Sequence, residues 1–228
     1  MRVTAGCGGE MERGLELVRR AYGRDPEAEW RRLEAGTQAR LEHLITSYAL
    51  ERHLPPPESG GRAPRAVRVL DAGGGPGRYT IQLAERGYRL TLLDLSPELL
   101  DLARQRVAAA APAVRQRVEA VVEGSITDLS AFPDARFDAV LCLGGPLSHV
   151  VDPGGQAAAV RELRRVAKPG APLFVSVMNR LGAYRTVVQW ADSWPQFFPH
   201  LPETGRATLA MGAPAYYFLP EEFVSAGL

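Results

Sequence analysis

The chain has 228 residues, of which 46% are hydrophobic and 23% charged, so it can bury a core without disulfides or a structural metal. Its 27 basic and 26 acidic residues give a net charge of +1, which argues against a dedicated nucleic-acid-binding protein. The two cysteines, Cys7 and Cys142, lie far apart, which excludes a zinc cluster and a disulfide framework. The sequence has no run of about 18 apolar residues, so we expect no membrane span and a cytoplasmic location.

The N-terminal part predicts helices followed by a linker. Residues 1–10 are small and rich in glycine, and we expect them to be flexible. Apolar residues then recur at helical spacing, and Asp25-Pro26 is a helix-start signal. Proline and glycine residues between 55 and 61 end the helical pattern. N-terminal helices and a linker are therefore expected over residues 11–64.

Predicted strands and helices alternate in the next part of the chain. The expected strands are Val67–Asp71, Leu90–Asp94, Val118–Glu123, Phe137–Leu143 and Pro172–Met178. The expected helices are Arg78–Arg86, Ser96–Ala110 and Gln156–Ala167. The fourth strand is a nearly continuous apolar run, which is typical of a strand buried on both faces. This alternation predicts an α/β core over residues 65–178, with a doubly wound, mostly parallel sheet.

Residues 179–217 interrupt the alternation. The stretch contains prolines and gathers many aromatic residues, namely Tyr184, Trp190, Trp194, Phe197, Phe198, Tyr216 and Tyr217. It is interpreted as a loop with a small core of its own or as a lid insertion over a pocket at the strand ends, and the two are compatible. A C-terminal helix is expected after it, so residues 179–228 form the last region.

The turn after the first predicted strand indicates ligand binding. It has no Gly-Lys pair, which excludes a P-loop, and Arg78 stands where the dinucleotide fingerprint requires glycine. The pattern that fits is acid-x-G-x-G-x-G, from Asp71 to Gly77. Glycines let a backbone approach a ligand closely, and the N-terminus of the following helix favours an anionic group. The Asp71 carboxylate beside the turn can attract a cation.

A second acidic residue ends the next predicted strand. Asp94 follows the last glycine of the turn by 94 − 77 = 17 residues, a position suited to accepting two hydrogen bonds from a ribose diol. A ligand with a carboxylate, an ammonium group, a ribose and an adenine would satisfy all of these groups.

These motifs resemble those of the class I S-adenosylmethionine-dependent methyltransferases. The resemblance rests on Val69–Gly77 together with Leu93–Pro97, and it extends over about residues 67–178, including Lys168-Pro169-Gly170. It most resembles the branch that methylates small molecules, such as the quinone-biosynthesis methyltransferases. The resemblance implies a Rossmann-like fold, S-adenosyl-L-methionine as cofactor, and direct in-line displacement onto a small-molecule methyl acceptor, with S-adenosyl-L-homocysteine as product.

The resemblance also implies roles for individual residues. The glycines would cradle the methionine half of the cofactor, Asp71 would reach its ammonium group and Asp94 its ribose. Relatives often carry Gly-Asp after the third strand, whereas this chain has Gly124-Ser125, so Ser125 and the Ile126 backbone are expected near the adenine. Asp128 is an alternative, although it equally fits capping the next turn. The expected cofactor-binding residues are Asp71, Gly73, Gly74, Gly75, Gly77, Asp94, Leu95, Ser125, Ile126 and Leu143.

A general base is needed only if the methyl acceptor enters the site protonated. His149 follows the fourth strand, and its ordinary pKa of about 6.5 suits a general base. Shaping the cofactor pocket is the competing interpretation of His149. His200 is a second candidate, from the lid. We expect Cys142 to be a buried hydrophobic residue, and no metal is expected.

One further departure from the family and several alternatives stay open at this point. Relatives end their sheet with two more strands, whereas here no sequence remains for strands 6 and 7, and a bare sheet edge favours a homodimer. A family that methylates a wobble-uridine carboxylate in tRNA shares a similar Leu-Asp-Ala-Gly-Gly-Gly stretch, so a tRNA modified-nucleoside methyltransferase is one alternative. A non-catalytic S-adenosylmethionine-binding module and a nicotinamide oxidoreductase are the others. The arginines that could form a local RNA-binding patch are Arg19, Arg20, Arg24, Arg31 and Arg32.

Overall fold

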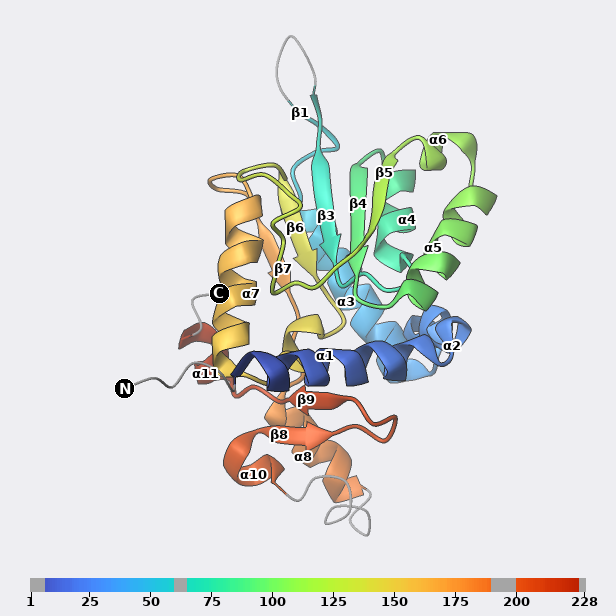
Figure 1. The fold of residues 1–228 in the computed structure, drawn as a ribbon. Coiled ribbons are helices and arrows are strands. Elements are labelled where there is room, and N and C mark those ends of the chain that lie inside the picture. Colours follow the sequence, from blue (N-terminus) through green and yellow to red (C-terminus); the bar gives the residue numbers. More distant parts are fainter. Residues whose placement is uncertain (1–6, 60–64, 190–199, 226–228) are drawn as a thin grey trace.

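The structure is a computed structural model that describes residues 7–59, 65–189 and 200–225 (Figure 1). Five parallel strands form its central sheet, in the order β5-β4-β3-β6-β7. Their bounds are β3 Arg68–Ala72, β4 Arg89–Asp94, β5 Val118–Glu123, β6 Ala139–Cys142 and β7 Leu173–Val175. This arrangement confirms the predicted α/β fold with a doubly wound parallel sheet.

Helices cover both faces of the sheet. Successive residues of a strand point to opposite faces, and here the residues on both faces are apolar, so both faces have to be covered. Val69, Leu90 and Leu141 pack against α3 Thr37–His53, α4 Arg78–Glu85 and the short α6 Pro112–Arg115. α5 Pro97–Ala109 packs on Leu92 of the same face. On the other face, Leu70 and Val140 pack against α7 Pro153–Val166 and the segment 126–137.

The N-terminal segment folds into α1 Cys7–Gly23, α2 Pro26–Arg31, the 3₁₀ turn η1 Arg32–Glu34 and α3. Of residues 1–10, which were expected to be flexible, residues 7–10 belong to the first turn of α1. Met11 reaches Gly155 at the start of α7, and this contact supports that turn. Two short strands pair at the predicted linker: β1 Glu58–Ser59 lies within it, and β2 Arg65–Ala66 follows it directly.

The segment expected to be irregular contains regular structure. α8 Arg180–Gln189 is followed by α10 Leu201–Thr204 and by an antiparallel pair of strands, β8 Arg206–Thr208 and β9 Pro214–Tyr216. Arg180 is buried and donates to Glu222 of α11 Pro220–Ser225 at 3.0 Å, which fastens this segment together. Trp190, Trp194, Phe197 and Phe198 lie outside the described residues.

α1 crosses the carboxyl ends of the strands. In Figure 1 it lies between the sheet above and the β8–β9 pair below, and it contacts both β9 and the 3₁₀ turn η2 Pro146–His149. Within the described residues, no sixth or seventh strand joins the sheet. No helix in that part of the chain is long and apolar enough to cross a membrane.

Candidate functional site

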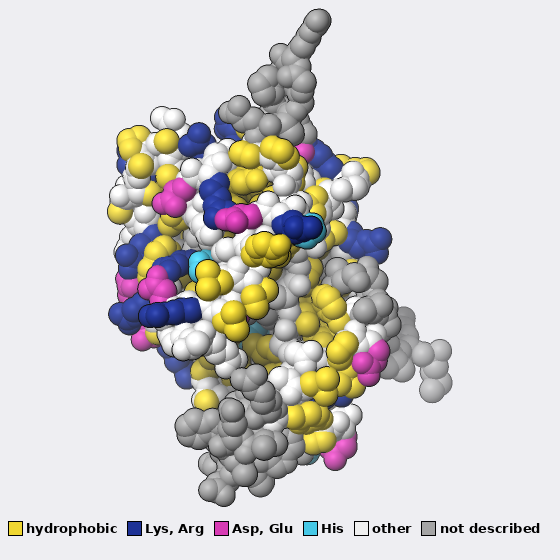
Figure 2. Space-filling view, turned by 180° about the vertical axis from the view of Figure 1, so that it is seen from behind, with side chains coloured by type: hydrophobic (Ala, Val, Ile, Leu, Met, Phe, Trp, Pro, Cys, Tyr) yellow, Lys and Arg dark blue, Asp and Glu magenta, His cyan; other side chains and the backbone are white. Residues whose placement is uncertain are grey.

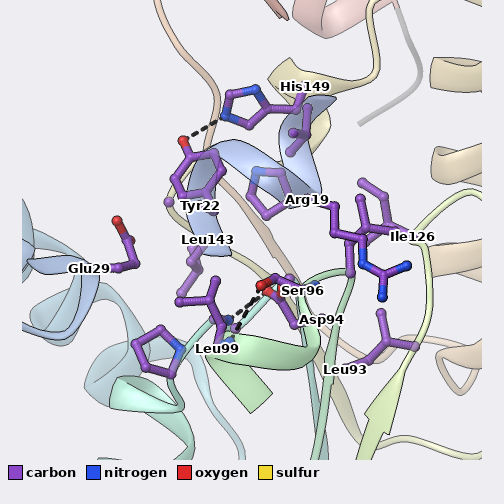
Figure 3. A pocket seen from close by; sticks show the side chains of 18 of the residues that line it. Arg19, Tyr22, Glu29, Leu93, Asp94, Ser96, Leu99, Ile126, Leu143 and His149 are labelled. Carbon is purple, nitrogen blue, oxygen red and sulfur yellow. Dashed lines mark hydrogen bonds between the residues drawn. The ribbon is translucent and has the colours of Figure 1, made fainter. Parts of the chain in front are cut away.

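A cavity of about 960 Å³, including its mouth, opens at the carboxyl ends of β3, β4, β5 and β6 (Figure 3). Within the sheet, β4 lies on one side of β3 and β6 lies on the other side. The cavity therefore lies at the point where the strand order reverses. Open α/β sheets bind their ligands in this crevice. α1, α2 and η1 form its roof.

The glycine turn forms the floor of the cavity. Gly73 and Gly74 both donate their N–H groups to the Leu93 carbonyl, at 2.7 and 3.2 Å, which pins the turn to β4. Gly73 has φ +79°, and a Cβ there would lie 2.4 Å from Pro146 Cγ. A Cβ on Gly74 would lie 2.5 Å from the Asp71 carboxylate. Only glycine fits at these two positions.

The N–H groups of this turn are already used inside the protein. Gly75 donates to Asp94, and Gly77, which is the N-cap of α4, donates to the Gly74 carbonyl. These four N–H groups are therefore not available to a ligand. The expectation that the N-terminus of the following helix, α4, favours an anionic group stays a prediction. Arg19 and Arg32 reach the cavity from the roof and are further candidates to hold such a group.

Asp94 presents to the cavity a carboxylate that backbone N–H groups hold in place. Oδ2 accepts the Gly75 N–H at 2.8 Å and Oδ1 accepts the Ser96 N–H at 2.9 Å, and the carboxylate lines the cavity with 8% of the residue exposed (Figure 3). Each carboxylate oxygen has a second lone pair. Burial raises the pKa of Asp94 to about 6. The arrangement matches a pair of neighbouring hydroxyl groups.

Asp71 lies beneath the glycine turn and does not line the cavity. Its Oδ2 accepts the Thr80 hydroxyl at 2.7 Å, and its buried Oδ1 has no partner. Burial raises the pKa of Asp71 to about 6. An unpaired buried carboxylate oxygen is costly, and a nearby cation in the cavity would offset that cost.

The far end of the cavity is apolar. Leu95, Leu99 and Ile126 line it, as does Leu143 on the side of β6. Ser125 also lines it, but its hydroxyl is hydrogen-bonded to Thr127 at 2.8 Å. Asp128 is exposed and accepts the Ser130 N–H, so the structure gives it the capping role.

Sequence motifs did not reveal the charged residues of the roof. Arg32 pairs with Glu29 at 2.6 Å, and its Nη2 lies 2.9 Å from the position of a Cβ on Gly144. Arg19 reaches the cavity from α1 and pairs with Glu123 at 3.4 Å. These residues come from helices without a motif, and only the fold brings them over the strand ends. Helical spacing places them on α1 and η1 but does not indicate which face turns toward the sheet.

His149 lines the cavity and is 6% exposed. Its Nδ1 lies 2.8 Å from the Pro214 carbonyl of β9, and its Nε2 lies 2.8 Å from the Tyr22 hydroxyl of α1 (Figure 3). Burial lowers the pKa of His149 below its ordinary value. Tyr22 also lines the cavity, and the sequence analysis did not single it out.

The other predicted residues lie away from the cavity. His200 is exposed, and Cys142 is fully buried within β6, where burial raises the pKa of its thiol to about 12. Gly77 faces Ala103 of α5. Among the described residues, 179–217 contribute no side chain to the cavity lining, although the Pro214 carbonyl is hydrogen-bonded to His149.

Comparison with known proteins relates part of the chain to methyltransferases. A family model described as a methyltransferase domain matches residues 69–170. The ubiquinone biosynthesis O-methyltransferase of Xanthomonas oryzae pv. oryzae (strain PXO99A) is 40% identical over 117 residues, which are 51% of this chain and 45% of that protein. Its counterpart of the same name from Xylella fastidiosa (strain M23) is 34% identical over 176 residues, 77% of this chain and 62% of that protein.

Residues 69–170 are thus similar to methyltransferase domains, and the sheet around them has the Rossmann-like methyltransferase fold. The chain spans about half the length of the first curated relatives that it matches. Solved structures share this fold. A methyltransferase from Methanosarcina mazei has a TM-score of 0.60 at 24% identity, covering 78% of this chain and 81% of its own. The 1,6-didemethyltoxoflavin N1-methyltransferase of Burkholderia thailandensis has a TM-score of 0.60 at 19% identity, covering 99% of this chain and 79% of its own.

Proposed function

We propose that this chain is an S-adenosylmethionine-dependent methyltransferase that transfers a methyl group to a small-molecule acceptor by direct in-line displacement. The observation that carries the proposal is Asp94, whose carboxylate is held by two backbone N–H groups at the edge of the cavity. This geometry suits the two ribose hydroxyls of a nucleoside. Relatives at up to 40% identity, named as O-methyltransferases, support it.

The residues around the cavity fit the parts of S-adenosylmethionine. The apolar end at Leu95, Leu99 and Ile126 suits an adenine ring. The unpaired Oδ1 of Asp71, beneath the glycine turn, favours a positive charge such as the ammonium group. Arg32 in the roof is the cationic partner for the carboxylate. When bound, this cofactor supplies a methyl group already activated on a sulfonium.

The chain's own residues orient the acceptor and exclude water. Leu15, Val18 and Val150 give the acceptor side of the cavity apolar walls, with Tyr22 and His149 as its polar groups. This lining suits a small aromatic or amphipathic molecule. Holding two reactants in line lowers the activation barrier of such reactions by roughly 7–11 kcal/mol. His149 is the proposed base, and its lowered pKa keeps it unprotonated at neutral pH.

Calorimetric titration with S-adenosylhomocysteine tests this function. Asp94→Ala is expected to weaken binding by roughly 100-fold, because two hydrogen bonds to a charged group are lost. Asp128→Ala is the matched control, since Asp128 is an exposed acidic residue outside the cavity. A wild-type protein that binds NADH and not S-adenosylhomocysteine would overturn the proposal.

A further inference from the structure

Arg19 brings a positive charge to the β5 end of the cavity. It comes from α1 and lines the cavity, and its Nη2 lies 3.4 Å from Oε1 of Glu123, the last residue of β5. Gly124, Ser125 and Ile126 follow Glu123 directly in the chain, and all three line the cavity. Figure 3 shows the Arg19 side chain extending toward Ile126. The Arg19 guanidinium therefore lies beside the apolar end of the cavity that suits a purine ring.

The acidic residues that line the cavity belong to other parts of it. Among the described residues they are Asp94 and Glu29. Asp94 ends β4 and, in the proposed function, holds the ribose. Glu29 pairs with Arg32, whose guanidinium lies against Gly144 after β6. Since β4 and β3 lie between β5 and β6, the ends of these two outer strands are roughly 14 Å apart, and Glu29 is remote from the β5 end.

The other polar groups near Arg19 do not replace a carboxylate at the base. Glu98 and Glu123 both lie close to Arg19, but neither lines the cavity. The Ser125 hydroxyl accepts the Thr127 N–H at 3.2 Å and lies 2.8 Å from the Thr127 hydroxyl. A hydroxyl can donate or accept, so it favours neither kind of ligand group, whereas a guanidinium can only donate. Arg19 is therefore the group here that distinguishes one base from another.

Purine bases differ in what they offer to a guanidinium. In adenine, N7 accepts a hydrogen bond, but the neighbouring 6-amino group donates one. In hypoxanthine, N7 and the 6-carbonyl oxygen both accept, as they do in guanine. Arginine contacts this pair of acceptors through two hydrogen bonds, the commonest specific contact in the reading of guanine. A guanidinium can thus make two hydrogen bonds to hypoxanthine and one to adenine, whereas a carboxylate would favour the amino group.

We propose that Arg19 opens the base end of the cavity to 6-oxopurines, so that the chain binds S-inosyl-L-homocysteine about as well as S-adenosyl-L-homocysteine. This inference rests on the proposed function, because it concerns the base of the same nucleoside ligand. Arg19 donates to the 6-carbonyl oxygen of hypoxanthine, and Glu123 holds the guanidinium in place from outside the cavity. The binding step makes and breaks no covalent bond.

Calorimetric titration of the wild-type protein with the two nucleosides tests the proposal directly. The two dissociation constants are expected to differ by less than tenfold. A site that recognises the amino group of adenine through a dedicated acceptor would reject hypoxanthine by roughly 10⁴-fold, because buried polar groups would be left unpaired. A difference of more than tenfold in favour of S-adenosylhomocysteine overturns the proposal.

Arg19→Met tests whether Arg19 is the group that accepts the 6-oxopurine. The variant keeps a long side chain and removes the hydrogen-bond donors. It is expected to weaken S-inosylhomocysteine about 30-fold, as for hydrogen bonds that involve a charged group, and S-adenosylhomocysteine only about threefold. The ratio of the two dissociation constants therefore changes about tenfold, and a change of less than fivefold overturns the role of Arg19. Arg20→Met is the control, since Arg20 of the same helix pairs with Glu16 and does not line the cavity.

Infrared spectroscopy separates a direct hydrogen bond from a packing role of Arg19. S-inosylhomocysteine labelled with ¹³C at position 6 identifies the carbonyl band of the bound ligand. Donation from Arg19 weakens the carbonyl bond, so this band is expected at a lower frequency in the wild type than in Arg19→Met. Equal frequencies in the two proteins would overturn the assigned contact.

The same titrations distinguish failure of this inference from failure of the proposed function. A wild-type protein that binds S-adenosylhomocysteine but rejects S-inosylhomocysteine overturns the inference alone. A wild-type protein that binds neither nucleoside overturns the proposed function and the inference with it.

Discussion

Asp94 shows how one carboxylate is prepared for a ligand. Backbone N–H groups hold it on two sides, and burial raises its pKa to about 6. Burying an ionised carboxylate costs free energy. Because the Asp94 carboxylate faces the cavity, hydroxyl groups of a ligand can stabilise its ionised form. Asp71 beneath the glycine turn has the same raised pKa, of about 6, and an unpaired oxygen.

The raised pKa values predict how binding depends on pH. S-adenosylhomocysteine binds the ionised form of Asp94, and protonation removes one acceptor. Because the pKa is about 6, affinity is expected to rise with pH from 5 to about 7 and to level off above it. At pH 5.0 we expect roughly tenfold weaker binding than at pH 7.5, by calorimetry.

Asp94→Ala is the control for this pH dependence. This substitution should make the affinity for S-adenosylhomocysteine depend less on pH. The remaining pH dependence would come from Asp71, which loses its proton over the same pH range. Equal affinity of the wild type at both pH values, or tighter binding at pH 5.0, would contradict the assignment of these carboxylates to the ligand.

At the scale of elements, a single tryptophan fastens the roof to the core. Trp30 of α2 lies between the guanidinium groups of Arg78 and Arg106, at 4.9 and 4.8 Å from its ring centre. Arg78 also pairs with Glu34 of η1, and Arg106 pairs with Glu27 at 2.7 Å. These contacts hold α2 and η1 against α4 and α5, and so keep Arg32 over the cavity.

Loss of this contact is expected to loosen the roof. Trp30→Ala removes two cation–π interactions worth about 1–2 kcal/mol together, so S-adenosylhomocysteine should bind roughly tenfold more weakly. Stopped-flow measurement should place most of the change in the dissociation rate. Arg104→Ala, in an exposed α5 pair with Asp101, is the control. A Trp30→Ala protein with unchanged dissociation would show that the roof does not retain the ligand.

The elements also show which parts of the fold the sequence predicts. β5 matches its predicted bounds, because its apolar run is clear and its ends are marked. β6 is shorter than predicted, since Phe137 makes only an isolated bridge with Ala167. α1 lies over the cavity, a position that its helical pattern alone does not indicate. The Tyr22–His149 contact spans 127 residues, and no local pattern encodes a contact of that separation.

For the whole molecule, the charge distribution favours a small acceptor over RNA. The net charge is +1, and three of the five candidate patch arginines, Arg19, Arg20 and Arg32, form ion pairs with glutamates. On the face shown in Figure 2, basic and acidic side chains are interspersed and form no continuous basic surface. Homodimer formation and a cytoplasmic location stay predictions.

This charge distribution predicts no tight binding of RNA. In a gel-shift titration at 50 and 150 mM salt, we expect no complex with bulk tRNA at micromolar protein, because few phosphates would be neutralised. A basic protein of similar size serves as the positive control. A complex whose affinity falls steeply between the two salt concentrations would favour the tRNA methyltransferase alternative instead.

The origin of the roof has a consequence for the order in which the molecule assembles. A ribosome releases α1 first, whereas the residues that receive its buried face, His149 and the strand from Pro214 to Tyr216, are added more than a hundred positions later. While the sheet is being synthesised, α5 is available to this amphipathic helix but β9 is not. Closure of the cavity is therefore expected to be among the last events of folding, after the strands beneath it have paired.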